Sequence, residues 1–112
     1  MAGILDKCKK RRCYPVDLGD GDKIFVRALT NDEIDRVQAI DTDIAIPLII
    51  GLGLVDESRS QVLPLVSPET ENEWAIRLRT ELKDMPADTT NQLVESIRRV
   101  SRAQPVEEIA KN

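Results

Sequence analysis

The chain has 112 residues with a formal net charge of −4, and 41% of its residues are hydrophobic while 32% are charged. This length fits one domain, because two halves would be too small to bury a core, and the apolar content excludes a wholly disordered chain. The sequence has no histidine and only three aromatic residues, which argues against the commonest catalytic base, an aromatic-lined small-molecule pocket and a stacking platform for single-stranded nucleic acid.

The first thirteen residues are strongly basic. Five cations stand in residues 7–12 against one acid, Asp6, so the rest of the chain sums to −8. Because these cations repel one another and have few apolar neighbours, they predict a flexible basic arm over residues 1–13. We interpret it as a solubilising or partner-docking arm, with Arg11 and Arg12 as candidate contacts. The same cations suit phosphate contacts, so a nucleic-acid-associated or regulatory protein is the alternative, which the acidic remainder disfavours.

A β-hairpin is predicted next. Residues 14–18 and 23–29 are strand-like runs on either side of Gly19-Asp20-Gly21-Asp22, a connection typical of hairpins. In the second run Ile24 and Val26 alternate with Phe25 and Arg27, which makes one face apolar. A lone hairpin is marginal in water, so we expect it to pack on helices.

Two helices are predicted in the middle of the chain. Thr30 and Glu33 have the spacing of a capping box, which predicts a helix that starts there and ends near residues 41–43. Residues 44–55 are almost entirely apolar, so they fit either a buried strand or a short central helix; we favour a helix that begins near Pro47. Gly51 and Gly53 are interpreted as small residues that allow close packing.

Two further helices are predicted near the end. Ser67-Pro68 is a typical helix start, and Trp74, Leu78 and Leu82 form the apolar stripe of the helix that would follow. Pro86 is expected to begin the last helix, which would form an antiparallel pair with the preceding one. The fold class is therefore α+β: an N-terminal β-hairpin packed on a small bundle of about four helices. We expect one domain over residues 14–103 and a loose C-terminal tail over residues 104–112.

No chemical motif in the chain predicts catalysis. Cys8 and Cys13 are too few to complete a zinc site, although thiols among cations are reactive, which keeps a thiol-based enzyme as a third hypothesis. We expect no catalytic residue, no metal and no cofactor. The longest apolar run, residues 44–55, is shorter than the roughly 18–20 residues that span a bilayer, so we also expect no membrane contact and a cytoplasmic location.

The order of short motifs resembles that of the tail assembly chaperones of long-tailed bacteriophages. The chain runs Phe25-Val26-Arg27-Ala28-Leu29 into Thr30-Asn31-Asp32-Glu33, similar to the family's "V-R-x-L-(S/T)-x-x-E" segment. Leu54-Val55-Asp56-Glu57 then closes the apolar segment, and Asp84-Met85-Pro86-Ala87-Asp88 stands where the family has "L-P-A-D"-like residues, with Met for Leu. The resemblance covers about residues 14–103 and leaves out the basic arm.

This resemblance implies a chaperone that binds the tape measure protein and keeps it soluble while the tail tube assembles. The major tail tube protein is a second candidate partner, and the implied location is the host cell cytoplasm. One small domain would cover little of a long client, so we also expect a homo-oligomer. The candidate interaction residues are the apolar Ile49, Ile50, Leu52 and Leu54. The alternative is that they lie in the core, since an apolar segment more often forms core than interface.

Overall fold

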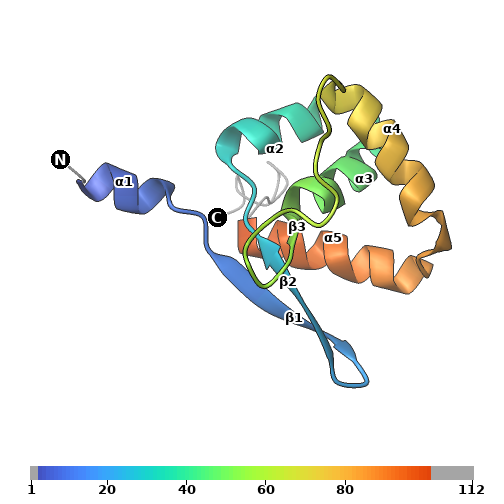
Figure 1. The fold of residues 1–112 in the computed structure, drawn as a ribbon, viewed down its shortest axis with the longest axis horizontal. Coiled ribbons are helices and arrows are strands. Elements are labelled where there is room, and N and C mark those ends of the chain that lie inside the picture. The colour runs from blue at the N-terminus through green and yellow to red at the C-terminus, as the bar shows by residue number, and fades with distance from the viewer. Residues whose placement is uncertain (1–2, 102–112) are drawn as a thin grey trace, which may run out of the picture.

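The computed structural model describes residues 3–101, and it is an α+β fold, as predicted (Figure 1). A three-stranded antiparallel sheet lies on one side of four longer helices. The elements in chain order are α1 (Ile4–Lys9), β1 (Cys13–Gly19), β2 (Asp22–Arg27), α2 (Asn31–Gln38), α3 (Thr42–Gly53), β3 (Leu54–Val55), α4 (Glu71–Glu81), the 3-10 helix η1 (Leu82–Asp84) and α5 (Ala87–Ser101).

The predicted hairpin is confirmed, with β1 and β2 paired so that Val16 lies opposite Ile24. Its turn needs left-handed backbone, since Gly19 has φ +95° and Gly21 has φ +82°, values that glycine adopts without strain. The third strand, β3, was not predicted. It pairs with β2, which makes β2 the central strand and leaves Val26 with no exposed surface.

The capping box that begins α2 is also confirmed. The Glu33 amide donates to Thr30 Oγ1 at 3.1 Å, and the Thr30 amide donates to Glu33 Oε1 at 2.9 Å. The helix ends at Gln38, slightly before the predicted end near residues 41–43.

The choice of a helix for the apolar segment is confirmed, but its start near Pro47 is wrong. Helix α3 begins at Thr42, and Pro47 lies inside it. An interior proline costs about 3 kcal/mol, whereas full burial of one large aliphatic side chain contributes about 1.5–3 kcal/mol. Eight of the twelve residues of α3 are buried, among them Leu48, Ile49, Ile50 and Leu52, so burial outweighs the cost of the proline.

The predicted helix start at Ser67-Pro68 is wrong as well. Helix α4 begins at Glu71, because Thr70 caps it and forms a second reciprocal capping box with Glu73. Such a box satisfies two backbone donors at once, which a lone serine cap does not. Trp74 and Leu78 are buried as predicted, but Leu82 is only half-buried because α4 has ended there.

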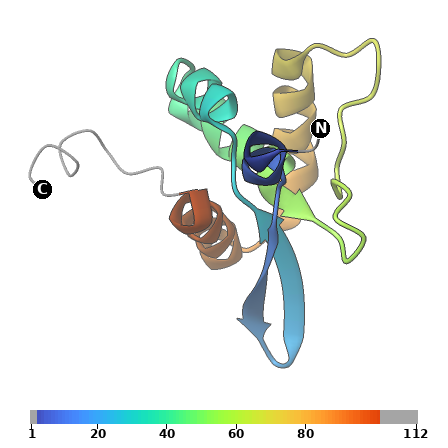
Figure 2. The ribbon, with the colours of Figure 1, turned by 90° about the vertical axis from the view of Figure 1, so that its left-hand side faces the viewer.

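Helices α4 and α5 do not form the predicted antiparallel pair. Both pack against α3, and α5 also packs against β2 (Figure 2). The reason is that α3 is apolar on nearly all sides, so it offers each helix a face of its own. The glycines of α3 allow this close approach, as interpreted from the sequence: a Cβ at Gly51 would lie 2.3 Å from Leu78 Cδ1, and one at Gly53 would lie 2.7 Å from Ile97 Cδ1.

The basic segment has more regular structure than predicted. Helix α1 lies within residues 1–13 and has no buried residue, and β1 already begins at Cys13. Figure 1 shows α1 projecting away from the helices of the body. The flexibility of this segment stays a prediction, and the predicted tail, residues 104–112, lies outside the described residues.

Candidate binding groove

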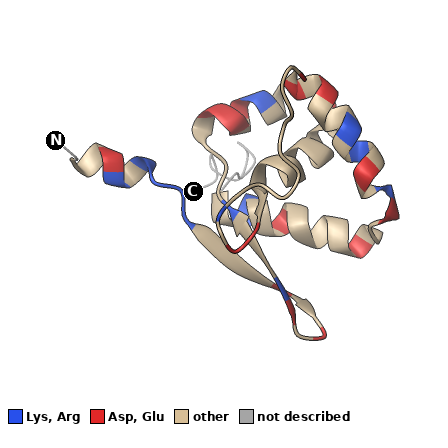
Figure 3. Cartoon of the chain, viewed as in Figure 1, with Lys and Arg blue, Asp and Glu red and all other residues tan. Residues whose placement is uncertain are grey.

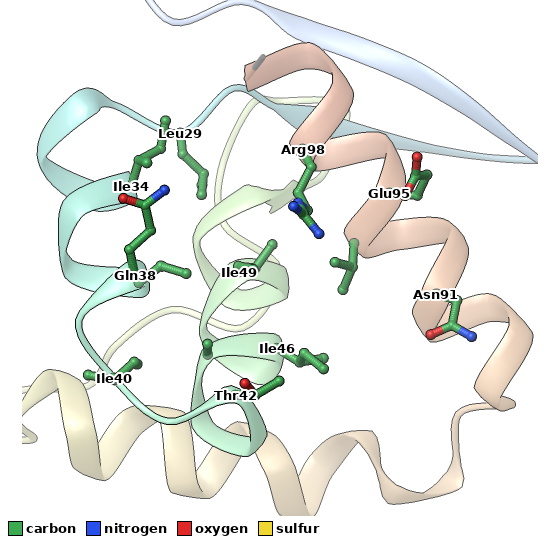
Figure 4. Close-up of a pocket in the computed structure, with 13 residues that line it drawn as sticks. Leu29, Ile34, Gln38, Ile40, Thr42, Ile46, Ile49, Asn91, Glu95 and Arg98 are labelled. Carbon is green, nitrogen blue, oxygen red and sulfur yellow. The ribbon is translucent and has the colours of Figure 1, made fainter. Parts of the chain in front are cut away.

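A groove of about 530 Å³ opens between α2, α3 and α5 (Figure 4). Helix α2 forms one wall, α5 forms the other, and α3 forms the floor. The lining residues are Leu29, Ile34, Val37, Gln38, Ile40, Thr42, Ala45, Ile46, Ile49, Asn91, Val94, Glu95 and Arg98.

The interior of the groove is apolar. Ile34 and Val37 come from α2, Ile46 and Ile49 from α3, and Val94 from α5. Four of these five side chains are only partly buried, whereas Ile49 is 8% exposed and forms part of the floor. Partly exposed aliphatic side chains gathered in a concave surface are typical of a site that binds another apolar surface.

Polar side chains stand at the edge of the groove. Gln38 and Thr42 lie at one side, and Asn91, Glu95 and Arg98 follow one another at roughly one-turn intervals along α5 (Figure 4). Glu95 and Arg98 are exposed, and among residues 3–101 they are the only charged residues that line the groove. A partner in the groove would therefore contact apolar side chains in its interior and one charge of each sign at its rim.

Each wall makes polar contacts with another segment of the fold. On α2, Arg36 Nε donates to Glu71 Oε1 of α4 at 3.0 Å, and this hydrogen bond is the largest cause of the raised pKa of Arg36. On α5, Ser101 Oγ accepts the Leu29 amide at 2.8 Å and donates to the Ile97 carbonyl at 2.6 Å. Each wall is therefore tied to a neighbouring segment by polar contacts.

The four apolar candidate residues do not act as one surface. Ile49 reaches the groove, but Ile50 is fully buried and Leu52 is 4% exposed, so these two side chains lie in the core. Their role as partner contacts stays a prediction. Leu54 is half-buried in β3, away from the groove lining. The helical spacing of Ile34, Val37 and Ile40 is visible in the sequence, but such spacing does not distinguish a core face from the lining of a groove.

The two basic candidate residues lie apart from the groove lining. Arg11 Nη2 pairs with Glu33 Oε1 at 2.8 Å, so this arginine holds the basic segment against the start of α2. Arg12 is exposed beside it. The neighbouring Arg27 donates to the Leu52 carbonyl at 2.8 Å, and its pKa is lowered first by burial and then by the positive charge of Arg11.

Charges are distributed unevenly over the described residues. Cations gather on α1 and the segment after it, while α2 begins with acids (Figure 3). Within residues 3–101, Cys8 and Cys13 are free thiols, and no three His, Cys, Asp or Glu side chains gather in a way that would hold a metal ion. No helix in this part of the chain combines the length and apolar character needed to cross a membrane.

Comparison with known proteins adds no assignment. No protein-family model, curated protein or solved structure matches this chain. We therefore infer function from the groove and from the order of the sequence motifs.

Proposed function

We propose that the groove between α2, α3 and α5 binds an amphipathic helix of a partner protein. The observation that carries this proposal is the concave apolar surface with a polar rim, which is the form of surface that accepts the apolar face of a helix. The partner that we propose is the tape measure protein of a long-tailed phage, and the chain would act as its assembly chaperone in the host cytoplasm. The choice of this client depends on the motif resemblance.

The length of the groove sets what it can bind. Its α5 wall runs from Asn91 to Arg98, which is about 10 Å at 1.5 Å per residue, or two turns of a helix. Two turns present three apolar residues at positions i, i+3 or i+4, and i+7. A long helical client with a continuous apolar stripe offers many such sites, so several copies of the chaperone would cover it in turn.

The small contact fits a role that requires release. A site of two turns binds weakly by itself, whereas several linked copies on one client gain affinity from their high effective concentration. For this reason we retain a homo-oligomer in the proposal. A chaperone bound through many weak contacts is displaced stepwise when tail tube protein polymerises around the client.

Co-expression with the tape measure protein tests this function. The wild-type chain is expected to keep the client soluble and to co-purify with it. Ile46→Asp, in the groove, is expected to weaken binding by about tenfold or more, because it removes an apolar contact and buries a charge. The matched control is Ile76→Asp on α4, an apolar residue 42% exposed outside the groove lining.

The two variants together make the result decisive. Circular dichroism first shows whether both remain folded. If folded Ile46→Asp binds the client as tightly as the wild type and Ile76→Asp do, the groove is not the binding site. If the wild type neither co-purifies with the client nor changes its solubility, the proposed client is wrong.

A further inference from the structure

Helix α1 presents an exposed apolar face. Ile4 is 80% exposed and Leu5 is 65% exposed, more than any other large hydrophobic side chain in residues 3–101. Together with Cys8 they occupy positions i, i+1 and i+4, which lie on one side of a helix. A helix of six residues is marginal in water by itself, because most helical stability in proteins comes from packing of the apolar face. Helix α1 therefore needs a surface to pack on.

The groove between α2, α3 and α5 matches this face in length and in character. Helix α1 spans about 9 Å at 1.5 Å per residue, and the α5 wall of the groove spans about 10 Å. The lining supplies partly exposed aliphatic side chains from all three helices, among them Ile34, Ile46 and Val94. A short helix with one apolar face is the kind of ligand that such a groove accepts.

The basic segment and the groove also carry complementary charge. Residues 1–13 contain five cations and one acid, whereas the rest of the chain sums to −8. On α1, Lys7 and Lys9 stand on either edge of the apolar face, and their long stems let the ammonium groups reach past it. The exposed carboxylate of Glu95, at the rim of the groove, is a partner for one of them.

One end of the groove is basic. Leu29 and Arg98 lie at this end (Figure 4). Leu29 also lines a neighbouring hollow together with Lys10 and Arg12, so the chain's own basic segment borders the same end. Like charges repel, so the cations of an incoming α1 are disfavoured at this end.

The other end of the groove is acidic. Asp41 directly precedes the lining residue Thr42, and both are exposed. The exposed Asp88 stands one helical turn before the lining residue Asn91. The cations at the C-terminal end of an incoming α1 are attracted to this end, so α1 would lie antiparallel to α5.

The antiparallel direction aligns the charges of the two helices. Ile4 and Lys7 are three residues apart on α1, and Arg98 and Glu95 are three residues apart on α5, so each pair is separated by about 4.5 Å along its helix axis. When Ile4 lies level with Arg98, Lys7 lies level with Glu95. The apolar side chain then packs on the aliphatic stem of the arginine, and the lysine approaches the carboxylate.

The α1 helix of the same chain is poorly placed to fill this groove. Arg11 Nη2 pairs with Glu33 Oε1 at 2.8 Å, which holds the basic segment at the start of α2. Only Lys10 stands between Arg11 and the end of α1 at Lys9. A helix that turns back along a neighbouring helix normally needs a connection of about two to five residues. Since α1 also projects away from the body, its partner is a second copy (Figure 1).

We propose that α1 of one copy docks in the groove of a second copy, with Ile4, Leu5 and Cys8 facing the apolar interior. This self-association depends only on α1 and the groove. A client helix that binds the same groove must displace α1, and that competition rests on the proposed function. Until a client arrives, the docked helix covers two apolar surfaces that would otherwise face water. The apparent affinity for the client falls in proportion to the fraction of free grooves.

Sedimentation of the full chain tests the self-association. The wild type is expected to form an assembly that dissociates on dilution. Leu5→Asp should raise the dissociation constant by about tenfold or more, and it leaves the body folded because α1 has no buried residue. Ile76→Asp on α4 puts the same charge at another exposed apolar residue and should associate as the wild type does. A monomeric wild type, or Leu5→Asp that associates as tightly as the wild type, would overturn the proposal.

Cross-linking between two different chains identifies the contact. One chain carries Cys13→Ser, so that Cys8 is its remaining thiol. The other carries Cys8→Ser, Cys13→Ser and Gln38→Cys, which puts its one thiol at the side of the groove. A short bismaleimide reagent, which joins two thiols, should link Cys8 of the first chain to position 38 of the second. The matched control carries Ile76→Cys in place of Gln38→Cys, and an equal yield from it would rule out the groove as the docking site.

A tape measure peptide separates this proposal from the proposed function. The peptide should dissociate the wild-type assembly, and Leu5→Asp should bind it about threefold or more tightly than the wild type does. Peptide binding without either change would refute the displacement and leave the self-association intact. If no variant binds the peptide, the proposed client is wrong, whereas the docking of α1 is decided by the sedimentation and cross-linking results without peptide.

Discussion

Substitution of Gly53 by alanine tests how closely α5 approaches α3. A Cβ at this position would lie 2.7 Å from Ile97 Cδ1 and 2.8 Å from both Ile97 Cγ1 and Cγ2. Real Cβ contacts are essentially never this short, and Ile97 has no exposed surface toward which to move. Overpacking of a well-packed core typically costs about 1–3 kcal/mol. Gly53 is the last residue of α3, so the higher helix propensity of alanine offsets little of this cost. We expect Gly53→Ala to lower the free energy of unfolding by about 1–3 kcal/mol.

A double-mutant cycle with Ile97→Ala isolates the contact. Ile97→Ala alone should lower the free energy of unfolding by about 2–5 kcal/mol, because it leaves a cavity in the core. In the double variant the new methyl group at position 53 enters the vacated space. The double variant should therefore lose less free energy of unfolding than the sum of the two single variants, by about 1 kcal/mol or more. Urea unfolding measures all four proteins, provided that the slope with urea concentration is the same for each.

The control for this cycle combines Gly53→Ala with Thr70→Ala, a capping residue of α4 on the protein surface. At sites without shared contacts, the changes in the free energy of unfolding add to within about 0.5 kcal/mol, and we expect the same of this pair. If Gly53→Ala is neutral, or if its coupling to Ile97→Ala is no larger than in the control pair, the close approach of α5 to α3 does not limit the packing.

The other predictions concern the segment before α4. Thr70→Ala should lower the free energy of unfolding by about 1 kcal/mol because it removes the helix cap. Ser67→Ala should change that free energy by less than about 0.5 kcal/mol. Equal losses of stability for the two variants in urea unfolding would contradict the helix start at Glu71. The pKa of Glu69 is lowered, first by the hydrogen bond from Arg77 and then by the Val66 amide. Its contribution to stability is thus present above the usual glutamate pKa of about 4.3 and is lost as the pH falls through the lowered pKa. Glu69→Gln should accordingly differ from wild type at pH 7 and converge with it in acid, whereas a pH-independent difference would refute the ion pair.

The features that the sequence predicted well are those that nearby residues determine. The turn needs glycine at positions 19 and 21, and the strands on either side alternate in polarity, so the hairpin is visible in a short window. The capping box of α2 spans only Thr30 to Glu33. By contrast, β3 has two residues, and its partner Val26 lies far from Leu54 in the sequence. So short a strand exists because β2 is already in place to pair with it.

The start of α4 shows a different limit. Two start signals stand three residues apart, Ser67-Pro68 and the capping box of Thr70 with Glu73, and each fits a helix when taken alone. The structure uses the second, which leaves Glu69 outside the helix and free to receive two hydrogen bonds from Arg77, at 2.9 and 3.0 Å. Local pattern cannot rank these signals, since the contact with Arg77 exists only once α4 has formed.

The groove could not be predicted for a reason that concerns the whole fold. Ile34 and Val37 on α2, and Val94 on α5, have the spacing of core residues, and a helix pair that packed directly would bury them. Here α2 and α5 each pack against α3, which also carries α4, so the central helix is shared among three partners. Within residues 3–101, no further helix or strand covers the sector of α3 between α2 and α5. A core-like pattern therefore lines an open groove, because the helices of residues 3–101 do not close around the all-apolar α3. This places the candidate site on the flank of the most hydrophobic segment instead of within it.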